Sequence, residues 1–510
     1  MDTFARRDFL KGLGGSVVTS AGAWAALQSI VPARAEDAHV TPDIVRFSPE
    51  MEPAVRWMED TPREQVFQVA AEQLKRGLPY RQLLGGLFLA GIRNIKPRPV
   101  GFKFHAVMAI NSAHQLALDS PQDDRLLPFF WALDNFKSSQ EQDVKEGDWS
   151  LAPVKESAVP SPSEARKRFA EAMDRWDEEA ADVAVAGLCR AAGAGEIAET
   201  LWCYGARDWQ NIGHKIIFTA QSFRTLDTIG WQHAEPVLRS LVYGLLTGGP
   251  TDSAAPTDSA APYAANQKLV SEIRPDWITR KPDWADGAPD SIATPSMFPI
   301  LRQAKPDEAA AAAVEQLNRG VAANSIWDAV MLAASDLLMR QPGIVALHAV
   351  TASNSMHYAF RSAAQDSTRL LTLLQACSWI PLYREAVRSR SGLPDGPTIF
   401  GMQAEHQIYS VEQILQKLGQ DRLKAAAKML TCTRKPGWTE TFMDAARHLI
   451  FTKGTDSHDY KFAAAAFEEV RHATPTWKSR LLAASVFHLK GASDPDSPLL
   501  ERTRQALAVL

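Results

Sequence analysis

Histidines dominate the residues of this chain that could do chemistry, because eight of its twelve fall into four pairs related by an internal repeat. The segment His105–His114, HAVMAINSAH, is identical at seven of ten positions to His348–His357, HAVTASNSMH. Both copies keep the two terminal histidines, the asparagine and the serine. Because imidazole is the commonest metal ligand among protein side chains, the repeat suggests a metal site to which both copies contribute.

The repeat extends well beyond these ten residues. The letters EQLKRG at 72–77 match EQLNRG at 315–320 at the same offset. With small gaps, the histidine at 233 pairs with that at 472, the histidine at 214 with that at 448, and the cysteine at 189 with that at 432. Self-similarity over such a length is the mark of a duplicated chain. We therefore predict an internal duplication.

Apolar residues recur at helical spacing in both copies. The helices expected in the first copy are 64–76, 81–94, 163–190, 196–226 and 235–247, and those in the second are 308–319, 326–338 and 370–387. No segment alternates apolar and polar residues over about six positions, as a half-buried strand would. We predict an all-α fold of two duplicated helical halves, 36–248 and 301–510, packed about a pseudo-twofold axis. A Pro/Ala/Asp-rich linker, 249–300, joins them.

The first 35 residues resemble a twin-arginine signal peptide. The pair Arg6-Arg7 precedes the apolar stretch Leu13–Val31, and Ala-Arg-Ala at 33–35 offers a small-x-small cleavage site. We expect residues 1–35 to be removed and the protein to be periplasmic or otherwise exported by the twin-arginine route. No later stretch is long and apolar enough to span a membrane.

Composition excludes several classes of partner. Of the 510 residues, 45% are hydrophobic and 22% charged, which is typical of a globular protein. A net charge of -4 gives no reason to expect nucleic acid or an anionic membrane surface as partner. The four cysteines form neither a C-x-x-C pair nor a haem-attachment motif. A small-molecule substrate is therefore the expected partner.

Two histidine pairs are the predicted metal ligands. Small residues flank His105 on its side of the helix, so this helix and its copy could approach closely, and His105 and His348 should meet. The second pair is His214 and His448. Four imidazoles, two from each half, would form one metal site at the pseudo-dyad. Such a set suits iron, copper, nickel or zinc, and nitrogen ligation alone does not choose among them.

Three further polar residues are candidates for catalytic roles near this site. Lys103 lies two residues before His105 and has no counterpart in the second copy. A lysine beside a metal could be repelled, neutral or carboxylated into an anionic ligand, and a solvated surface lysine is the alternative. Asn111 and Asn354, which the repeat conserves, could supply hydrogen bonds at the site.

Other histidines and one aspartate could support the ligands. Ligating histidines generally need an acceptor for the second ring nitrogen, which Asp208 could supply. His114 and His357 could serve as partners or alternative ligands, or could be polar core residues. His233 and His472 lie near expected helix starts, where structural capping is the simpler role.

The order of these motifs resembles questin oxidase-like proteins. The elements that carry the resemblance are His105–His114, the pair Gly213-His214 with its following apolar run, and the segment 348–353, HAVTAS. The resemblance implies an all-α non-haem iron oxygenase acting on polycyclic aromatic compounds. It implies as ligands His105, His214, His348 and His448, with Lys103 as a carboxylated one. Phe218 stands where that family has a second histidine, and its members are not typically exported, so the substrate does not transfer with the resemblance.

We therefore predict an exported, His-ligated metalloprotein, a non-haem iron oxidoreductase that uses O2 on a small organic substrate. One alternative is a zinc-dependent hydrolase or lyase at the same site, with copper a further choice of ion. Another is a non-catalytic helical scaffold whose histidines are structural. The chain has no G-x-S-x-G elbow, Walker loop or H-E-x-x-H motif that would point elsewhere.

Overall fold

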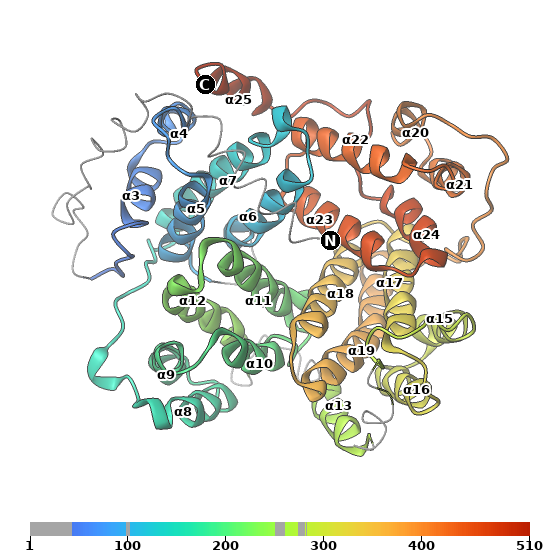
Figure 1. Cartoon of the computed structure of the whole chain (residues 1–510), viewed down its shortest axis with the longest axis horizontal. Coiled ribbons are helices and arrows are strands. Elements are labelled where there is room, and N and C mark those ends of the chain that lie inside the picture. The colour runs from blue at the N-terminus through green and yellow to red at the C-terminus, as the bar shows by residue number, and fades with distance from the viewer. Residues whose placement is uncertain (1–42, 98–101, 250–260, 274–280, 282) are drawn as a thin grey trace. The chain divides into compact units, whose positions relative to one another are not determined.

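A computed structural model of the chain describes residues 43–97, 102–249, 261–273, 281 and 283–510 (Figure 1). Within these residues the fold is all-α, with 22 α-helices and no strand, as predicted. None of their helices combines the length and the apolar character needed to cross a membrane. The expected signal peptide, 1–35, lies outside the described residues.

The helices form two compact units. The first unit comprises the described residues of Met1–Ala191, together with Ser222–Leu246 and Ser497–Leu510. Its helices are α3 (Glu52–Asp60), α4 (Val66–Lys75), α5 (Tyr80–Asn94), α6 (Phe102–Leu118), α7 (Leu127–Lys145), α8 (Pro162–Asp174), α9 (Glu178–Ala191), α12 (Ala234–Leu246) and α25 (Leu500–Leu507), with 3-10 turns η2 (Gln122–Asp124), η3 (Glu156–Ala158) and η4 (Trp231–His233).

The second unit comprises Ala192–Gln221 and the described residues of Thr247–Asp496. Its helices are α10 (Ala194–Gly205), α13 (Ala261–Glu272), α15 (Ala293–Gln303), α16 (Pro306–Asn318), α17 (Ala323–Arg340), α18 (Ile344–Ser362), α19 (Asp366–Ser391), α20 (Val411–Lys417), α21 (Arg422–Cys432), α22 (Trp438–Lys453), α23 (Ser457–His472) and α24 (Pro475–Ser485). Helix α11 (Gln210–Ile229) begins in this unit and ends in the first.

These units do not coincide with the halves expected from sequence. Residues 192–221 precede the expected linker and yet belong to the second unit, while the C-terminal helix α25 belongs to the first. Two polar contacts anchor α25 there: Arg502 forms an ion pair with Asp134 at 3.0 Å, and the Lys75 ammonium donates to the Val509 carbonyl at 2.8 Å. Helix packing, rather than order along the chain, therefore determines which residues belong to each unit.

The matched sequence segments form helices in the same order in both units. Helices α4, α5, α6 and α7 of the first unit correspond to α16, α17, α18 and α19 of the second. Both α4 and α16 end at a glycine with positive φ, Gly77 at 90° and Gly320 at 87°, because the left-handed residue that closes a helix disfavours a side chain. This parallel agrees with the repeat, and the duplication itself stays a prediction.

Two of the expected helical stretches and the expected linker differ from the structure. The stretch 163–190 is divided into α8 and α9, with Trp176 between them in the left-handed region at φ 59°. The stretch 196–226 is divided into α10 and α11. The expected linker 249–300 contains α13 and the start of α15, and Asn266 of α13 is buried with its amide bonded to Gln375 of α19 at 2.7 Å.

Helix α18 lies at the centre of the second unit, packed against α17, α19 and α23 (Figure 1). Its side chains from Val345 to Met356 are buried on every face. A helix with apolar and small residues all round is stable only when neighbours cover all of its faces. Because α18 carries His348 and Asn354, this arrangement buries both polar groups and requires partners for them, while His357 near the end of the helix is only partly covered.

Candidate functional site

Three histidines from different helices of the second unit lie together. His214 comes from α11, His348 from α18 and His458 from the first turn of α23. The Nε2 atoms of His214 and His348 are 3.0 Å apart, and the ring centroids of His348 and His458 are 5.1 Å apart. His348 and His458 offer ring nitrogens within 4.8 Å of each other, close enough to share one metal ion. We call these three residues the histidine cluster.

A strained turn positions His214. Asn211, Ile212 and Gly213 all have left-handed backbone angles, with φ of 55°, 53° and 82°. Such angles are costly for a β-branched residue like Ile212 and persist only where the surroundings enforce them. The Ile212 carbonyl accepts a hydrogen bond from the Tyr383 hydroxyl at 2.9 Å. The same turn brings the Asn211 carbonyl to the Nδ1 atom of His214.

Gly213 has no room for a side chain. A Cβ atom built there would lie 2.5 Å from the Tyr383 hydroxyl and 2.9 Å from the Cβ of Ala352. Glycine is therefore needed both for its positive φ and for the close approach of α18 and α19. The Gly213-His214 pair noted in the sequence is thus the end of a backbone turn that delivers an imidazole into the core.

Backbone carbonyls determine the tautomers of two cluster histidines. His348 Nδ1 lies 2.7 Å from the Ile344 carbonyl, and His214 Nδ1 contacts the Asn211 carbonyl. A carbonyl oxygen only accepts hydrogen bonds, so each Nδ1 carries the proton. In the neutral rings both Nε2 atoms then hold lone pairs, and these face one another at 3.0 Å. Two facing lone pairs repel unless a cation lies between them.

A shared proton is an unfavourable candidate for that cation. Burial lowers the pKa of His214 to about 3, and the nearby Lys461 charge lowers it further. Burial likewise lowers the pKa of His348 well below its usual value, with His214 and Lys461 adding to the effect. Both imidazoles are therefore neutral near pH 7, which is the form that ligates metals.

An aspartate orients the third histidine. Asp456 caps the N-terminus of α23 and accepts hydrogen bonds from the backbone N–H of His458 at 2.7 Å and from its Nδ1 at 2.5 Å. Burial alone would raise the pKa of Asp456, but these hydrogen bonds bring it down to about 2. A carboxylate on Nδ1 leaves Nε2 as the ligating atom, a pairing common around protein metal ions.

A lysine completes the surroundings of the cluster. Lys461 lies three residues after His458 on α23, hence on the same face of the helix, and is 2% exposed. Burial lowers its pKa to about 7, with the Asp456 charge opposing this effect. No hydrogen-bond partner for its ammonium is found among the described residues.

Of the predicted ligands, the structure brings together His214 and His348 within the second unit. His448 is exposed on α22, which does not suit a ligand of a buried site, and the second unit supplies His458 instead. His105 is buried on α6 of the first unit. The side chain of Lys103 lies outside the described residues.

Two of the other predicted polar residues, His114 and Asp208, have structural partners. His114 Nδ1 bonds the Tyr80 hydroxyl at 3.1 Å, and the two rings stack. Asn111 is buried on α6. Asp208 forms a buried ion pair with Lys215 at 2.8 Å and accepts from the backbone N–H of Gln210, so it supports the start of α11 rather than a histidine ring.

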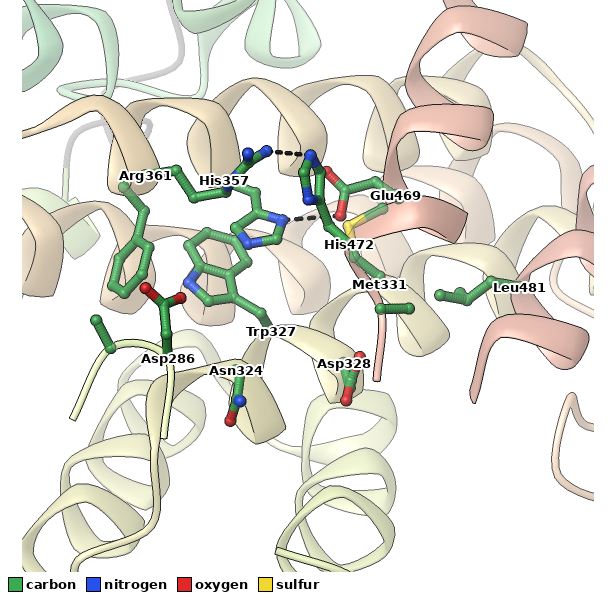
Figure 2. A pocket seen from close by; sticks show the side chains of 13 residues that line it. Asp286, Asn324, Trp327, Asp328, Met331, His357, Arg361, Glu469, His472 and Leu481 are labelled. Carbon is green, nitrogen blue, oxygen red and sulfur yellow. Dashed lines mark hydrogen bonds and ion pairs between the residues drawn. The ribbon is translucent and has the colours of Figure 1, made fainter. Parts of the chain in front are cut away.

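Of the remaining predicted residues, His357 lines a pocket between α17, α18, α23 and α24 (Figure 2), and Asn354 bonds to Glu469, another residue of its lining. The pocket has about 460 Å³ of empty volume, including the solvent at its mouth. Asn354 donates to Glu469 Oε1 at 2.8 Å, and Glu469 Oε2 accepts from His357 Nδ1 at 2.8 Å. The imidazole of His357 stacks on Trp327, with ring centroids 4.6 Å apart.

Charged groups in this pocket are held in unusual states. Burial raises the pKa of Asp328 to about 6, although its oxygens accept two hydrogen bonds from Thr474. Burial and the adjacent Arg361 lower the pKa of His472 to about 4. An imidazole whose Nδ1 bonds a buried carboxylate can accept a proton at Nε2. The pocket is therefore a second group of polar residues with perturbed pKa values, separate in its residues from the histidine cluster.

Sequence reasoning missed His458, Lys461 and Glu469, which all lie on α23. None belongs to a repeated pair, which is the feature that marks the other candidates in the sequence. One local signal was present: Asp456-Ser457-His458-Asp459 places an N-cap aspartate two residues before a histidine at the start of an apolar helix. The spacing of His458 and Lys461 then puts both on one face.

No protein-family model, curated protein or solved structure matches this chain.

Proposed function

We propose that the histidine cluster binds one transition-metal ion and that the protein is a non-haem iron oxidoreductase. The observation that carries the proposal is the pair of Nε2 lone pairs that face each other at 3.0 Å in a buried, neutral environment. A metal ion bound by both nitrogens turns this repulsion into two bonds. The carbonyl and carboxylate acceptors on the three Nδ1 atoms are those that orient metal-bound histidines.

The distance between the two nitrogens is compatible with one shared ion. Ligand nitrogens at about 2.1 Å from one ion are about 3.0 Å apart at an angle of 90°, and about 3.4 Å apart at the tetrahedral angle. The separation of 3.0 Å lets both nitrogens bind the same ion, and iron is proposed over zinc or copper because of the sequence resemblance. Three imidazoles would leave coordination positions for O2 and a substrate, and the iron would supply the redox chemistry.

Two further parts of the proposal rest on sequence alone. His105 of the first unit is proposed as an additional ligand, because it is the repeat counterpart of His348. Export by the twin-arginine route is proposed from the pattern of residues 1–35, and this route carries proteins that have already folded around a cofactor. The resemblance to questin oxidase-like proteins supports oxygenase chemistry as the reaction class.

The test is elemental analysis of the purified full chain and of single variants. We expect about one iron per chain in the wild type, and loss of most of it in His348→Ala and His458→Ala. The matched control is His448→Ala, which removes an exposed histidine of the adjacent helix α22 and should keep its iron. Circular dichroism and thermal unfolding of each variant show whether the fold is retained.

Each other outcome selects a different function. Stoichiometric zinc would favour a hydrolase or lyase that uses the ion as a Lewis acid, and copper would change the redox chemistry expected. No metal in a folded wild type would refute the metalloprotein proposal and leave a helical scaffold with structural histidines. Iron retained in His458→Ala and lost in His448→Ala would restore the ligand set expected from the repeat.

A further inference from the structure

The buried ammonium of Lys461 indicates what else the site binds. Lys461 is 2% exposed, and its Nζ has no hydrogen-bond partner among the described residues. Burying an ammonium without a hydrogen-bond partner is costly, and more so than burying a neutral polar group. Such a group is found where a ligand supplies the missing acceptor.

The lysine lies on the same helix face as one imidazole of the cluster. It shares the face of α23 with His458, three residues away. Its charge acts on both His214 and His348. The carboxylate that acts on Lys461 in turn, Asp456, is already engaged by the ring and backbone of His458.

The charge of the loaded site would be unbalanced without an anion. Three neutral imidazoles contribute no charge, so a divalent ion brings two positive charges against the one carboxylate of Asp456, and Lys461 adds a third when it is protonated. Burying net charge of this size is unfavourable unless it is paired. A ligand that carries negative charge and accepts hydrogen bonds would satisfy the metal and the lysine together.

We propose that the site takes a small carboxylate, one oxygen of which binds the metal while the other accepts a hydrogen bond from Lys461. This inference rests on the proposed function and names its substrate class as a small organic acid. A carboxylate suits the two partners because its two oxygens can each contact a different cation.

Cobalt(II) replaces iron in the test because its visible absorption reports ligand exchange, and acetate is the probe. In the wild type, acetate should shift the cobalt spectrum saturably. Lys461→Met should keep one cobalt per chain and bind acetate at least about tenfold more weakly, as expected for loss of a hydrogen bond to a charged group. The matched control, Lys137→Met, removes a buried lysine of the first unit that is already bonded to carbonyl oxygens, and should leave acetate affinity unchanged.

Three results would overturn the inference: no response of wild-type cobalt protein to acetate, equal acetate affinity in Lys461→Met, or a mass showing that Lys461 is carboxylated by CO2. Failure of the proposed function gives a different result, since the wild type would then take up no cobalt. In that case the anion site is tested by thermal unfolding of the metal-free chain with acetate. Acetate should still raise the unfolding temperature of the metal-free wild type, because the ammonium lacks a partner with or without metal. It should not raise that of metal-free Lys461→Met. An equal effect of acetate on the two proteins would refute the anion site.

Discussion

The carboxyl group of Asp328 offers a quantitative test of the pocket in Figure 2. Burial raises its pKa from 3.8 to about 6. A change of about two pH units corresponds to about 3 kcal/mol. Because the folded state holds the proton more tightly than the unfolded chain, the unfolding free energy should fall by about 2 kcal/mol as pH rises from about 4 to about 6 through this group.

The perturbation is Asp328→Asn, which removes the titration and keeps an oxygen that can accept from Thr474. The assay is urea unfolding of the metal-free chain at several values between pH 4 and pH 7, compared between variant and wild type so that other groups cancel. Relative to the wild type, the unfolding free energy of Asp328→Asn should rise by about 2 kcal/mol over this range. The control is Asp286→Asn, an exposed carboxylate of the same pocket.

A constant difference between Asp328→Asn and the wild type across this pH range would refute the reasoning. It would mean that the carboxyl group is solvated in the folded protein, and that the pocket is wider or wetter than its lining residues indicate. An equal pH dependence in Asp286→Asn would show that net charge, rather than burial of Asp328, produces the effect.

Three further outcomes follow from the structure. Gly213→Ala should destabilise the chain by at least about 2 kcal/mol and lower metal content, since its Cβ would meet Tyr383 and Ala352 at a positive φ; urea unfolding and elemental analysis test this. Glu469→Leu should cost about 2 to 4 kcal/mol because Asn354 and His357 lose a buried acceptor, and an unchanged unfolding free energy would contradict the hydrogen bonds described. Removing metal with a chelator should lower the unfolding temperature of the wild type, and an unchanged temperature would count against a ligand-bound native state.

Local sequence patterns determined the fold class and most of the helices. Helical periodicity and the glycines at 77 and 320 predicted α4, α5, α16 and α17 to within a few residues. These features depend on neighbours three or four positions apart, so the sequence displays them directly. The break at 211–213 was not predicted, because three consecutive left-handed residues that include Ile212 are stabilised by tertiary contacts such as the Tyr383 hydrogen bond.

The site was predicted only in part for a related reason. The internal repeat marks His214 and His348 because each has a histidine counterpart in the other copy. His458, Lys461 and Glu469 have none, and their significance comes from residues more than one hundred positions away: His348 for the first two and His357 for the third. The packing of α23 against α18 decides which polar groups share a buried space. Because burial makes a polar group without a partner costly, a buried lysine without a partner and two facing imidazoles indicate a missing ligand, which the sequence alone does not show.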